Sequence, residues 1–381
     1  MPQIAGFRGV LPDPTKLADM GKIDFKERLP SRDPLRALYR YHQLFQHGGR
    51  AVVRKAVIAA VRLAPWSEGT IRRHEAVTDP ARGLELARIQ TARAHLEPVL
   101  AGFRDAAGEI ERHFRRVDGE RPTIELATPD GTTHRLLRVQ SAEILGQVRH
   151  TLAPKKLHIL DGTDRYEAML AYQAELAADK SIAMYSSVNY GLMCLVNLDD
   201  PALVVAPRHR VVTATGQKPE AILAAAKAWF IVEKLAGAAR ELAKQEAALA
   251  DTLAHQPAFV MVFAGEADAW KLTLSPDVSP NAEGVVAHRA TQKLDPIVVD
   301  QLFVAKVLPA AKLAVEGDAQ AALAAVAKGA EAALIFRALT IDQLAHVAEL
   351  GQTLPPGSTG FAPPLPRGLI ANALDPDEDL Q

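Results

Sequence analysis

One short segment holds the residues best suited to bind a charged ligand: Leu160–Ala168, which reads L-D-G-T-D-R-Y-E-A. An apolar run precedes its Asp-Gly pair, and the apolar spacing after Gly162 predicts a helix that begins at the next residue. The free N–H groups of a helix start and a nearby arginine can together hold a phosphate. The candidate ligand-binding residues of this turn are Asp161, Gly162, Thr163, Asp164, Arg165 and Glu167.

The same turn carries features that oppose an anion. Asp164 and Glu167 place negative charge in the first helical turn, where a phosphate would approach. An equally simple interpretation is an ordinary capped helix in which Arg165 pairs with Asp161 or a neighbouring acid. The residues alone leave both interpretations open.

Histidines elsewhere in the chain have arginine neighbours. Cationic neighbours disfavour metal binding and favour contact with anions. The triplet Arg208-His209-Arg210 therefore adds His209 and Arg210 to the candidate ligand-binding residues. Residues 31–150 hold 20 Lys+Arg against 14 Asp+Glu, an excess of 20 − 14 = 6. This excess is typical of a solvated arginine-rich surface; the sharper interpretation is a basic cleft for a phosphorylated ligand.

Several strong signatures are missing from the sequence. It has no G-x-x-x-x-G-K-[ST], no G-x-G-x-x-G after a predicted strand and no G-x-S-x-G. His74-Glu75 begins like the zinc protease motif H-E-x-x-H, but Thr78 stands where the second histidine is needed. The single cysteine, Cys194, excludes a disulfide framework, and its apolar neighbours predict an inert thiol inside a strand. We therefore assign no catalytic residue and no metal site.

The periodicity of the chain predicts an α+β fold with mixed sheets and packed helices, because strands and helices alternate without a regular βαβ order. Predicted strands cover 51–63, 123–127, 134–139, 157–160, 191–198, 203–205, 258–264, 270–274 and 332–336. Predicted helices run from about 80 to 98, 163 to 179, 219 to 253 with a break near Gly237, 296 to 308, 319 to 328 and 341 to 350.

The 381 residues, 48% of them hydrophobic, suffice for two lobes. We expect an N-terminal lobe over 1–215, which opens with a strand and loops over 1–34, and a C-terminal lobe over 216–372. An acidic tail over 373–381 is expected to be disordered. The opening lacks a signal peptide and no window has the apolar length of a membrane span, so we expect a cytoplasmic protein that binds no membrane. The formal net charge of −1 argues against a nucleic-acid partner.

The order of these motifs resembles an uncharacterised bacterial and archaeal family, catalogued as domain of unknown function 1015, whose signature is close to A-D-G-H-H-R-Y-E-A. The resemblance covers almost the whole chain and rests on Ile4–Gly9, Tyr39–Tyr41, His74-Glu75, Asp130-Gly131 with His134, Leu160–Ala168, Pro207–Arg210, Ser358–Pro363 and Gly368-Leu369. It implies a second layer of residues that contact the ligand-binding turn rather than the ligand: His74, Glu75, His134, Ser358 and Thr359. The turn also resembles that of ParB- and sulfiredoxin-like folds, which include nucleotide-binding partition proteins and free-serine kinases. This second resemblance implies a phosphate or nucleotide at the helix start.

The sequence departs from the family where the site should be. Thr163 and Asp164 replace both signature histidines, and the early P-P-Y-D segment has no counterpart between Lys16 and Tyr39. Near the C-terminus, the family's lysines and tyrosines are replaced by Gly357, Gly360, Ala362 and Pro364.

These departures predict a non-catalytic binding or regulatory paralogue, a pseudoenzyme with a degenerate, weak phosphate or nucleotide site and no resident cofactor. One alternative is a phosphotransferase or nucleotide-hydrolysing enzyme of ParB-like type, with Asp161 or Glu167 as base and Arg165, His209 and Arg210 on the phosphate. Another is an interaction role, with an intact family paralogue or a second copy of the chain as partner.

Overall fold

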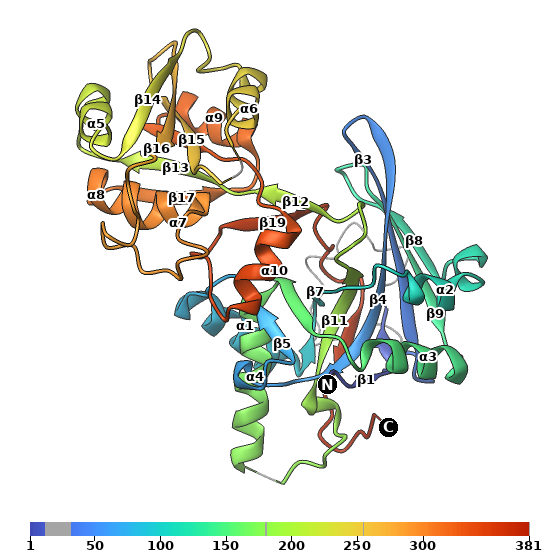
Figure 1. Cartoon of the computed structure of the whole chain (residues 1–381). Coiled ribbons are helices and arrows are strands. Elements are labelled where there is room, and N and C mark those ends of the chain that lie inside the picture. The colour runs from blue at the N-terminus through green and yellow to red at the C-terminus, as the bar shows by residue number, and fades with distance from the viewer. Residues whose placement is uncertain (12–31, 180, 254, 381) are drawn as a thin grey trace. The chain divides into compact units, whose positions relative to one another are not determined.

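The computed structural model describes residues 1–11, 32–179, 181–253 and 255–380 (Figure 1). The chain forms two compact units: unit 1 contains Met1–Val204 and Phe361–Gln381, and unit 2 contains Val205–Gly360. It passes from unit 1 to unit 2 within strand β12 (Val204–Pro207) and returns within β19 (Thr359–Ala362), and these strands pair with each other. Most of the opening segment, 12–31, lies outside the described residues. The fold is α+β, as predicted.

The large sheet of unit 1 has nine strands within the described residues, in the order β5-β10-β7-β11-β4-β3-β9-β8, with β1 paired to β4. Their bounds are β1 (Ile4–Ala5), β3 (Leu38–His47), β4 (Arg50–Arg62), β5 (Ile71–Arg73), β7 (Val99–Phe103), β8 (Ile124–Ala127), β9 (Thr133–Val139), β10 (Leu157–Asp161) and β11 (Tyr190–Asn197). The strands predicted over 51–63, 157–160 and 191–198 and the hairpin at Asp130-Gly131 are confirmed. Strand β10 pairs in parallel with β5 and antiparallel with β7.

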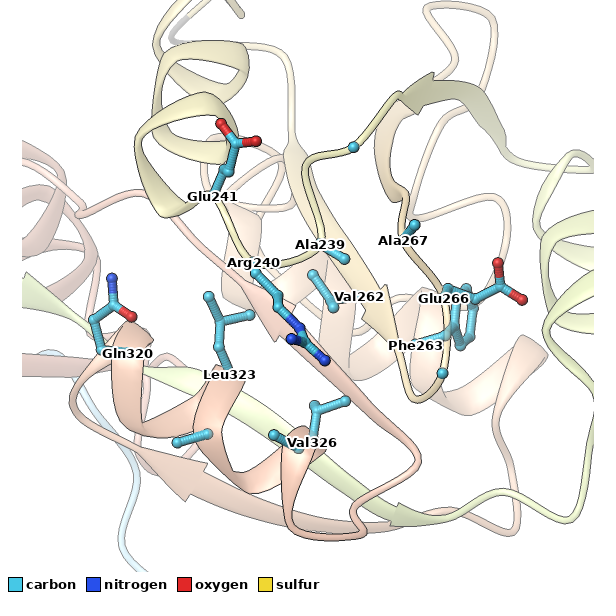
Figure 2. A pocket seen from close by; sticks show the side chains of 14 residues that line it. Ala239, Arg240, Glu241, Val262, Phe263, Glu266, Ala267, Gln320, Leu323 and Val326 are labelled. Carbon is cyan, nitrogen blue, oxygen red and sulfur yellow. The ribbon is translucent and has the colours of Figure 1, made fainter.

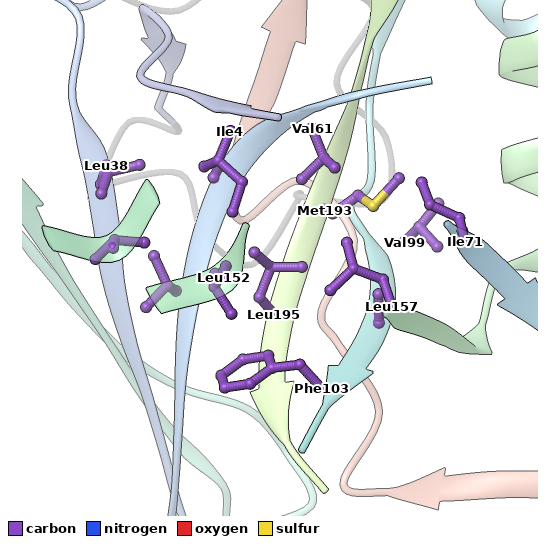
Figure 3. Packing of buried hydrophobic residues seen from close by; sticks show 14 of the residues in the cluster. Ile4, Leu38, Val61, Ile71, Val99, Phe103, Leu152, Leu157, Met193 and Leu195 are labelled. Atoms are coloured by element: carbon purple, nitrogen blue, oxygen red, sulfur yellow. The ribbon is translucent and has the colours of Figure 1, made fainter. Parts of the chain in front are cut away.

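Helices cover the apolar face of this sheet. They are α1 (Asp79–Ala92), α2 (Glu109–Phe114), α3 (Ala142–Leu152) and α4 (Thr163–Asp179), with 3-10 turns at Trp66–Glu68, Val117–Gly119 and Ser187–Asn189. Figure 3 shows part of this core, where Leu152 of α3 lies among sheet residues such as Leu157 and Leu195. From α4, Tyr166 and Met169 are buried in this cluster and Leu170 packs against it, as the helical spacing predicts.

The single cysteine lies where the sequence predicts. Cys194 is 1% exposed inside β11, and its burial raises the pKa of the thiol to about 12. Because the thiolate is the reactive form, this cysteine is inert at neutral pH.

A small three-stranded sheet brings the C-terminal segment into unit 1. It consists of β2 (Gly9–Val10), β20 (Ala371–Ala373) and β6 (Ala94–His95), with β20 in the middle. The prediction of a disordered tail is wrong for the described residues after β20. Leu380 is 2% exposed, and the hydroxyl of Ser187 donates to the carbonyl of Asp375 at 2.7 Å. The apolar Leu380 and these backbone contacts outweigh the acidic composition on which the prediction rested.

Unit 2 contains a six-stranded sheet within the described residues, in the order β14-β16-β15-β18-β13-β17. Its strands are β13 (His209–Ala214), β14 (Phe230–Leu235), β15 (Ala258–Phe263), β16 (Ala269–Leu274), β17 (Lys312–Glu316) and β18 (Ala332–Ile335). Its helices are α5 (Pro219–Ala226), α6 (Leu242–Ala250), α7 (Asp295–Val298), α8 (Ala305–Val307), α9 (Ala319–Ala327) and α10 (Ile341–Glu349). A π-helical turn at Val299–Val304 joins α7 to α8, so the predicted helix over 296–308 is present in this modified form.

The helical segment predicted over 219–253, with a break near Gly237, is only partly correct. The structure divides this segment into α5, the edge strand β14 and α6. Phe230, Ile231 and Val232 favour a strand and pair with β16, so strand pairing interrupts the helical segment between its two alanine-rich parts.

The division into units differs from the expected lobes 1–215 and 216–372. The first boundary comes earlier because β13 pairs with β17 and β18 of unit 2. The second comes earlier because residues 361–381 return to unit 1, where β20 joins β2 and β6.

Candidate functional site

The predicted turn joins β10 directly to α4. Gly162 has φ 87°, a left-handed conformation that favours glycine. A Cβ atom at this position would also lie 2.5 Å from the Nη2 of Arg165. The glycine therefore lets the arginine side chain fold back over the start of its own helix.

Arg165 is held between two carboxylates. Its Nη2 donates to Asp161 Oδ2 at 3.0 Å, and its Nη1 lies 3.5 Å from Glu97 Oε1. Glu97 also pairs with Arg367, whose Nε lies 3.3 Å from Oε2. Burial raises the pKa of Glu97, and the positive charges of Arg165 and Arg367 partly offset this rise. Burial lowers the pKa of Arg165, but Asp161, Glu97 and Asp164 outweigh it, so the net pKa is raised and the guanidinium stays charged.

Four of the buried polar atoms that have no hydrogen-bond partner among the described residues belong to Arg165 and to two residues of the small sheet: Arg165 Nε, His95 Nδ1, and Nδ2 and Oδ1 of Asn372. His95 and Asn372 are directly opposite each other on β6 and β20. Side chains of opposite residues project from the same face of a sheet, about 5 Å apart at Cβ. His95 is two residues from Glu97 in the chain, and Glu97 contacts Arg165. The unpartnered atoms thus come from residues linked by contact, pairing or chain proximity.

His74 and His95 are neutral at pH 7. Burial lowers the pKa of His74 to about 4 and that of His95 to about 3. His74 Nδ1 lies 2.9 Å from the carbonyl oxygen of Ile159, in the strand that ends at Asp161. This contact ties His74 to the backbone of the strand that precedes the turn.

The remaining residues of the turn are tied into the helix start. Thr163 is buried, and Asp164 Oδ1 accepts the backbone N–H of Arg165 at 2.8 Å. Glu167 is paired with Arg73 of β5. The negative charge at the helix start is thus partly satisfied inside unit 1.

His209 and Arg210 belong to unit 2, and the structure gives each an internal partner. His209 Nδ1 accepts the backbone N–H of Phe336 at 3.2 Å, and burial lowers the pKa of His209 to about 4. Arg210 donates to Asp300 Oδ2 at 2.8 Å and to the carbonyl of Gly357 at 2.7 Å. Both side chains are committed to the packing of β13.

The other residues expected to support the turn are dispersed. His134 of β9 bonds to Tyr41 at 2.7 Å through Nδ1, and Glu75 follows β5. Ser358 and Thr359 belong to unit 2, where the Ser358 hydroxyl donates to the carbonyl of Pro355 at 2.6 Å. Only His74 and Glu75 adjoin a strand that pairs with β10.

Unit 2 contains a groove of about 750 Å³ (Figure 2). Its walls are mainly apolar and include Leu323 and Val326 of α9, and Figure 2 shows Arg240 extending over it. Glu241 and Glu266 also line the groove. Because acids outnumber the one arginine, the lining does not select an anion.

Two kinds of feature are absent from the described residues. No group of three or more His, Cys, Asp or Glu side chains there could hold a metal ion. No helix among them has the length and apolar character needed to cross a membrane.

A family model described as "Protein of unknown function (DUF1015)" matches residues 25–301. The chain belongs to this family. The match includes the Asp161–Arg165 turn, Glu97 and His95, and it ends before Arg367 and Asn372. A comparison with curated proteins gives no match.

Solved structures show only distant similarity to this family member. A conserved hypothetical protein from Pyrococcus furiosus is 13% identical, with 82% of this chain and 93% of that chain covered and a TM-score of 0.38. A free serine kinase in complex with AMP is 13% identical, with 84% and 92% covered and a TM-score of 0.40. SbnI with a C-terminal truncation, from Staphylococcus aureus, is 12% identical, with 84% and 90% covered and a TM-score of 0.38. Similarities this distant carry no conclusion about activity.

Sequence reasoning identified the turn but missed the residues around it. Glu97, Arg367, His95 and Asn372 belong to no motif. An ion pair joins Glu97 to Arg367, and the pairing of β6 with β20 places His95 opposite Asn372. The signal that could have found Glu97 is weak: an acid immediately before Pro98, at the end of a predicted helix.

Proposed function

We propose that unit 1 is a non-catalytic binding module for a small phosphorylated ligand, held at the start of α4 beside Arg165, Glu97, His95 and Asn372. One observation carries the proposal: buried polar atoms of Arg165, His95 and Asn372 have no hydrogen-bond partner among the described residues. Buried polar groups are nearly always hydrogen-bonded, so these atoms require an explanation. A ligand that completes these bonds supplies one.

The donors and acceptors fit a phosphate attached to a polar body. The Nε–H of Arg165 and the N–H groups of a helix start are donors, which suit phosphate oxygens. Asn372 offers both a donor and an acceptor, and neutral His95 offers one or the other at Nδ1, which suits hydroxyl or amino groups. Nucleotides and sugar phosphates share this chemistry, consistent with the resemblance of the turn to ParB- and sulfiredoxin-like proteins.

The surrounding charges favour weak binding without catalysis. The Arg165 guanidinium is already paired with Asp161 and Glu97, so a phosphate must compete with both carboxylates. Catalytic acids and bases work best with pKa values near the operating pH, whereas His74 and His95 have pKa values of about 4 and 3. A regulatory role that senses ligand concentration suits such a site better than turnover.

Titration calorimetry with inorganic phosphate, ADP and ATP tests the proposal. We expect a Kd near the millimolar range, about −4 kcal/mol, for the parent protein. Arg165→Ala should weaken binding about tenfold or more, because it removes a charged donor. Asp161→Asn and Asp164→His should each strengthen binding, because each removes negative charge beside the phosphate. Arg104→Ala is the matched control, since this exposed arginine pairs with Asp199 away from the turn.

Two outcomes contradict the proposal. Unchanged affinity in Arg165→Ala and in both acidic-residue variants would show that the turn is only a helix cap. Turnover of ATP, alone or with free serine, that disappears in Asp161→Asn would instead establish the phosphotransferase alternative with Asp161 as base.

A further inference from the structure

Strand β17 forms one edge of the sheet in unit 2. It pairs with β13 on one side, and no described strand pairs with its other side. An open strand edge presents unpaired N–H and C=O groups that can extend the sheet with another chain. Natural proteins usually protect such edges, so an exposed edge requires an occupant or a device that blocks one.

Most side chains of β17 are exposed to solvent. Its five residues read K-L-A-V-E, and the first four are exposed. Leu313 is 37% exposed and Val315 is 49% exposed, although both are apolar. Because side chains alternate along a strand, these two share one face, and Lys312, Ala314 and Glu316 share the other. Each face therefore has its own chemistry.

The sequence of β17 is complementary to itself. If two copies pair antiparallel about Ala314, each Lys312 lies opposite a Glu316 and each Leu313 lies opposite a Val315. One face then carries two opposite-charge pairs, and the other carries a four-residue apolar cluster. A two-fold interface requires this self-complementarity, because the same patch must fit itself.

The charges at this edge are available for such pairing. Within the described residues, neither Lys312 nor Glu316 forms an ion pair. The Glu316 carboxylate accepts hydrogen bonds from the backbone N–H groups of Gly317 at 2.7 Å and Asp318 at 3.3 Å. The opposite edge differs, since Glu233 and Lys234 of β14 are already paired with Lys271 and Asp268. The free charges are at the β17 edge.

We propose that two copies of this chain associate through antiparallel pairing of β17, which joins their six-stranded sheets into one continuous sheet. The apolar cluster and the four charged residues set the register. Five paired residues bury less than the roughly 800 Å² per partner of a standard stable interface, so the dimer is weak and depends on protein concentration.

A charge-swap experiment on the full chain tests this pairing. Sedimentation analysis over a dilution series should show a monomer–dimer equilibrium for the parent. Lys312→Glu should raise the dissociation constant about tenfold or more, because Glu then faces Glu316 twice. Glu316→Lys should do the same by placing lysine opposite Lys312. The double variant Lys312→Glu with Glu316→Lys restores opposite charges and should restore parent-like association.

Two further variants complete the design. Lys328→Glu makes the same charge change at an exposed residue beyond α9 and should leave association unchanged. Leu313→Asp should weaken the dimer in both the parent and the double-swap background. A parent that stays monomeric throughout the series, or single and double variants that associate alike, would overturn the proposal. Circular dichroism confirms that each variant is folded, and any misfolded single variant is replaced by the neutral changes Lys312→Gln and Glu316→Gln, which should each weaken the dimer severalfold.

Discussion

At the scale of single residues, Gly162 is the position on which the turn most depends. Gly162→Ala forces a side chain into a left-handed conformation and places Cβ against the Arg165 guanidinium. We expect backbone strain to lower the free energy of unfolding by about 1–3 kcal/mol, and the displacement of Arg165 to lower it further. Gly48→Ala is the control, because Gly48 has φ 56° and nothing lies near its Cβ position. Urea denaturation should show the larger loss at Gly162, and equal losses would mean that Arg165 adapts freely.

The sequence predicted the charged turn because its residues are neighbours in the chain. The structure shows Arg165 paired with Asp161, the ion pair named in the capped-helix interpretation, and also with Glu97, which no local pattern indicates. His95 and Asn372 could not be predicted as a pair, because only the register of β6 with β20 places them opposite each other. Local motifs find candidate residues, but the partners of those residues are set by strand pairing.

At the scale of elements, α4 is fixed by its buried face. Met169 is 2% exposed within the core of unit 1, and its sulfur would contact a Cβ placed at Gly191. Met169→Asp should cost about 3–5 kcal/mol, because it leaves an unpaired charge in an apolar core. Ala174→Asp, at an exposed position of the same helix, should cost far less. Equal destabilisation in chemical denaturation would show that α4 is held by its ends rather than by this face.

Periodicity predicted α4 well because two features indicate the same helix: the apolar stripe along it and the buried strand that comes directly before it. It failed in part over 219–253, where alanine content suggested a helical segment broken near Gly237 and the chain instead forms β14 between two helices. Alanine favours helix only weakly per residue, whereas six paired residues of β14 gain cross-strand contacts with β16. Composition is therefore a poor guide where a short β-branched run can join an existing sheet.

At the scale of the whole molecule, the path of the chain was the least predictable feature. Unit 1 is completed by residues 361–381, which follow all of unit 2 in the sequence. Asn372 and Arg367 of the proposed site come from this returning segment, so the site needs both ends of unit 1. Proline content and acidic residues suggested a loose tail, and nothing local signals that β20 pairs with β2 and β6.

The buried histidines make the stability of the folded chain depend on pH. Unfolded histidine has a pKa near 6.5, whereas His95 has a pKa of about 3 and His74 of about 4. The unfolded state therefore binds more protons below pH 6.5, and stability falls as the pH is lowered through that window towards the folded pKa values. Between pH 7 and pH 5, each of these two histidines should lower the free energy of unfolding by about 2 kcal/mol. In urea denaturation at both pH values, His95→Asn should reduce this pH-dependent loss by that amount, while His47→Asn, at an exposed position, should leave it unchanged. An equal pH dependence in the parent and in His95→Asn would mean that protonated His95 is stabilised in the folded state, for example by the carboxylate of Glu97.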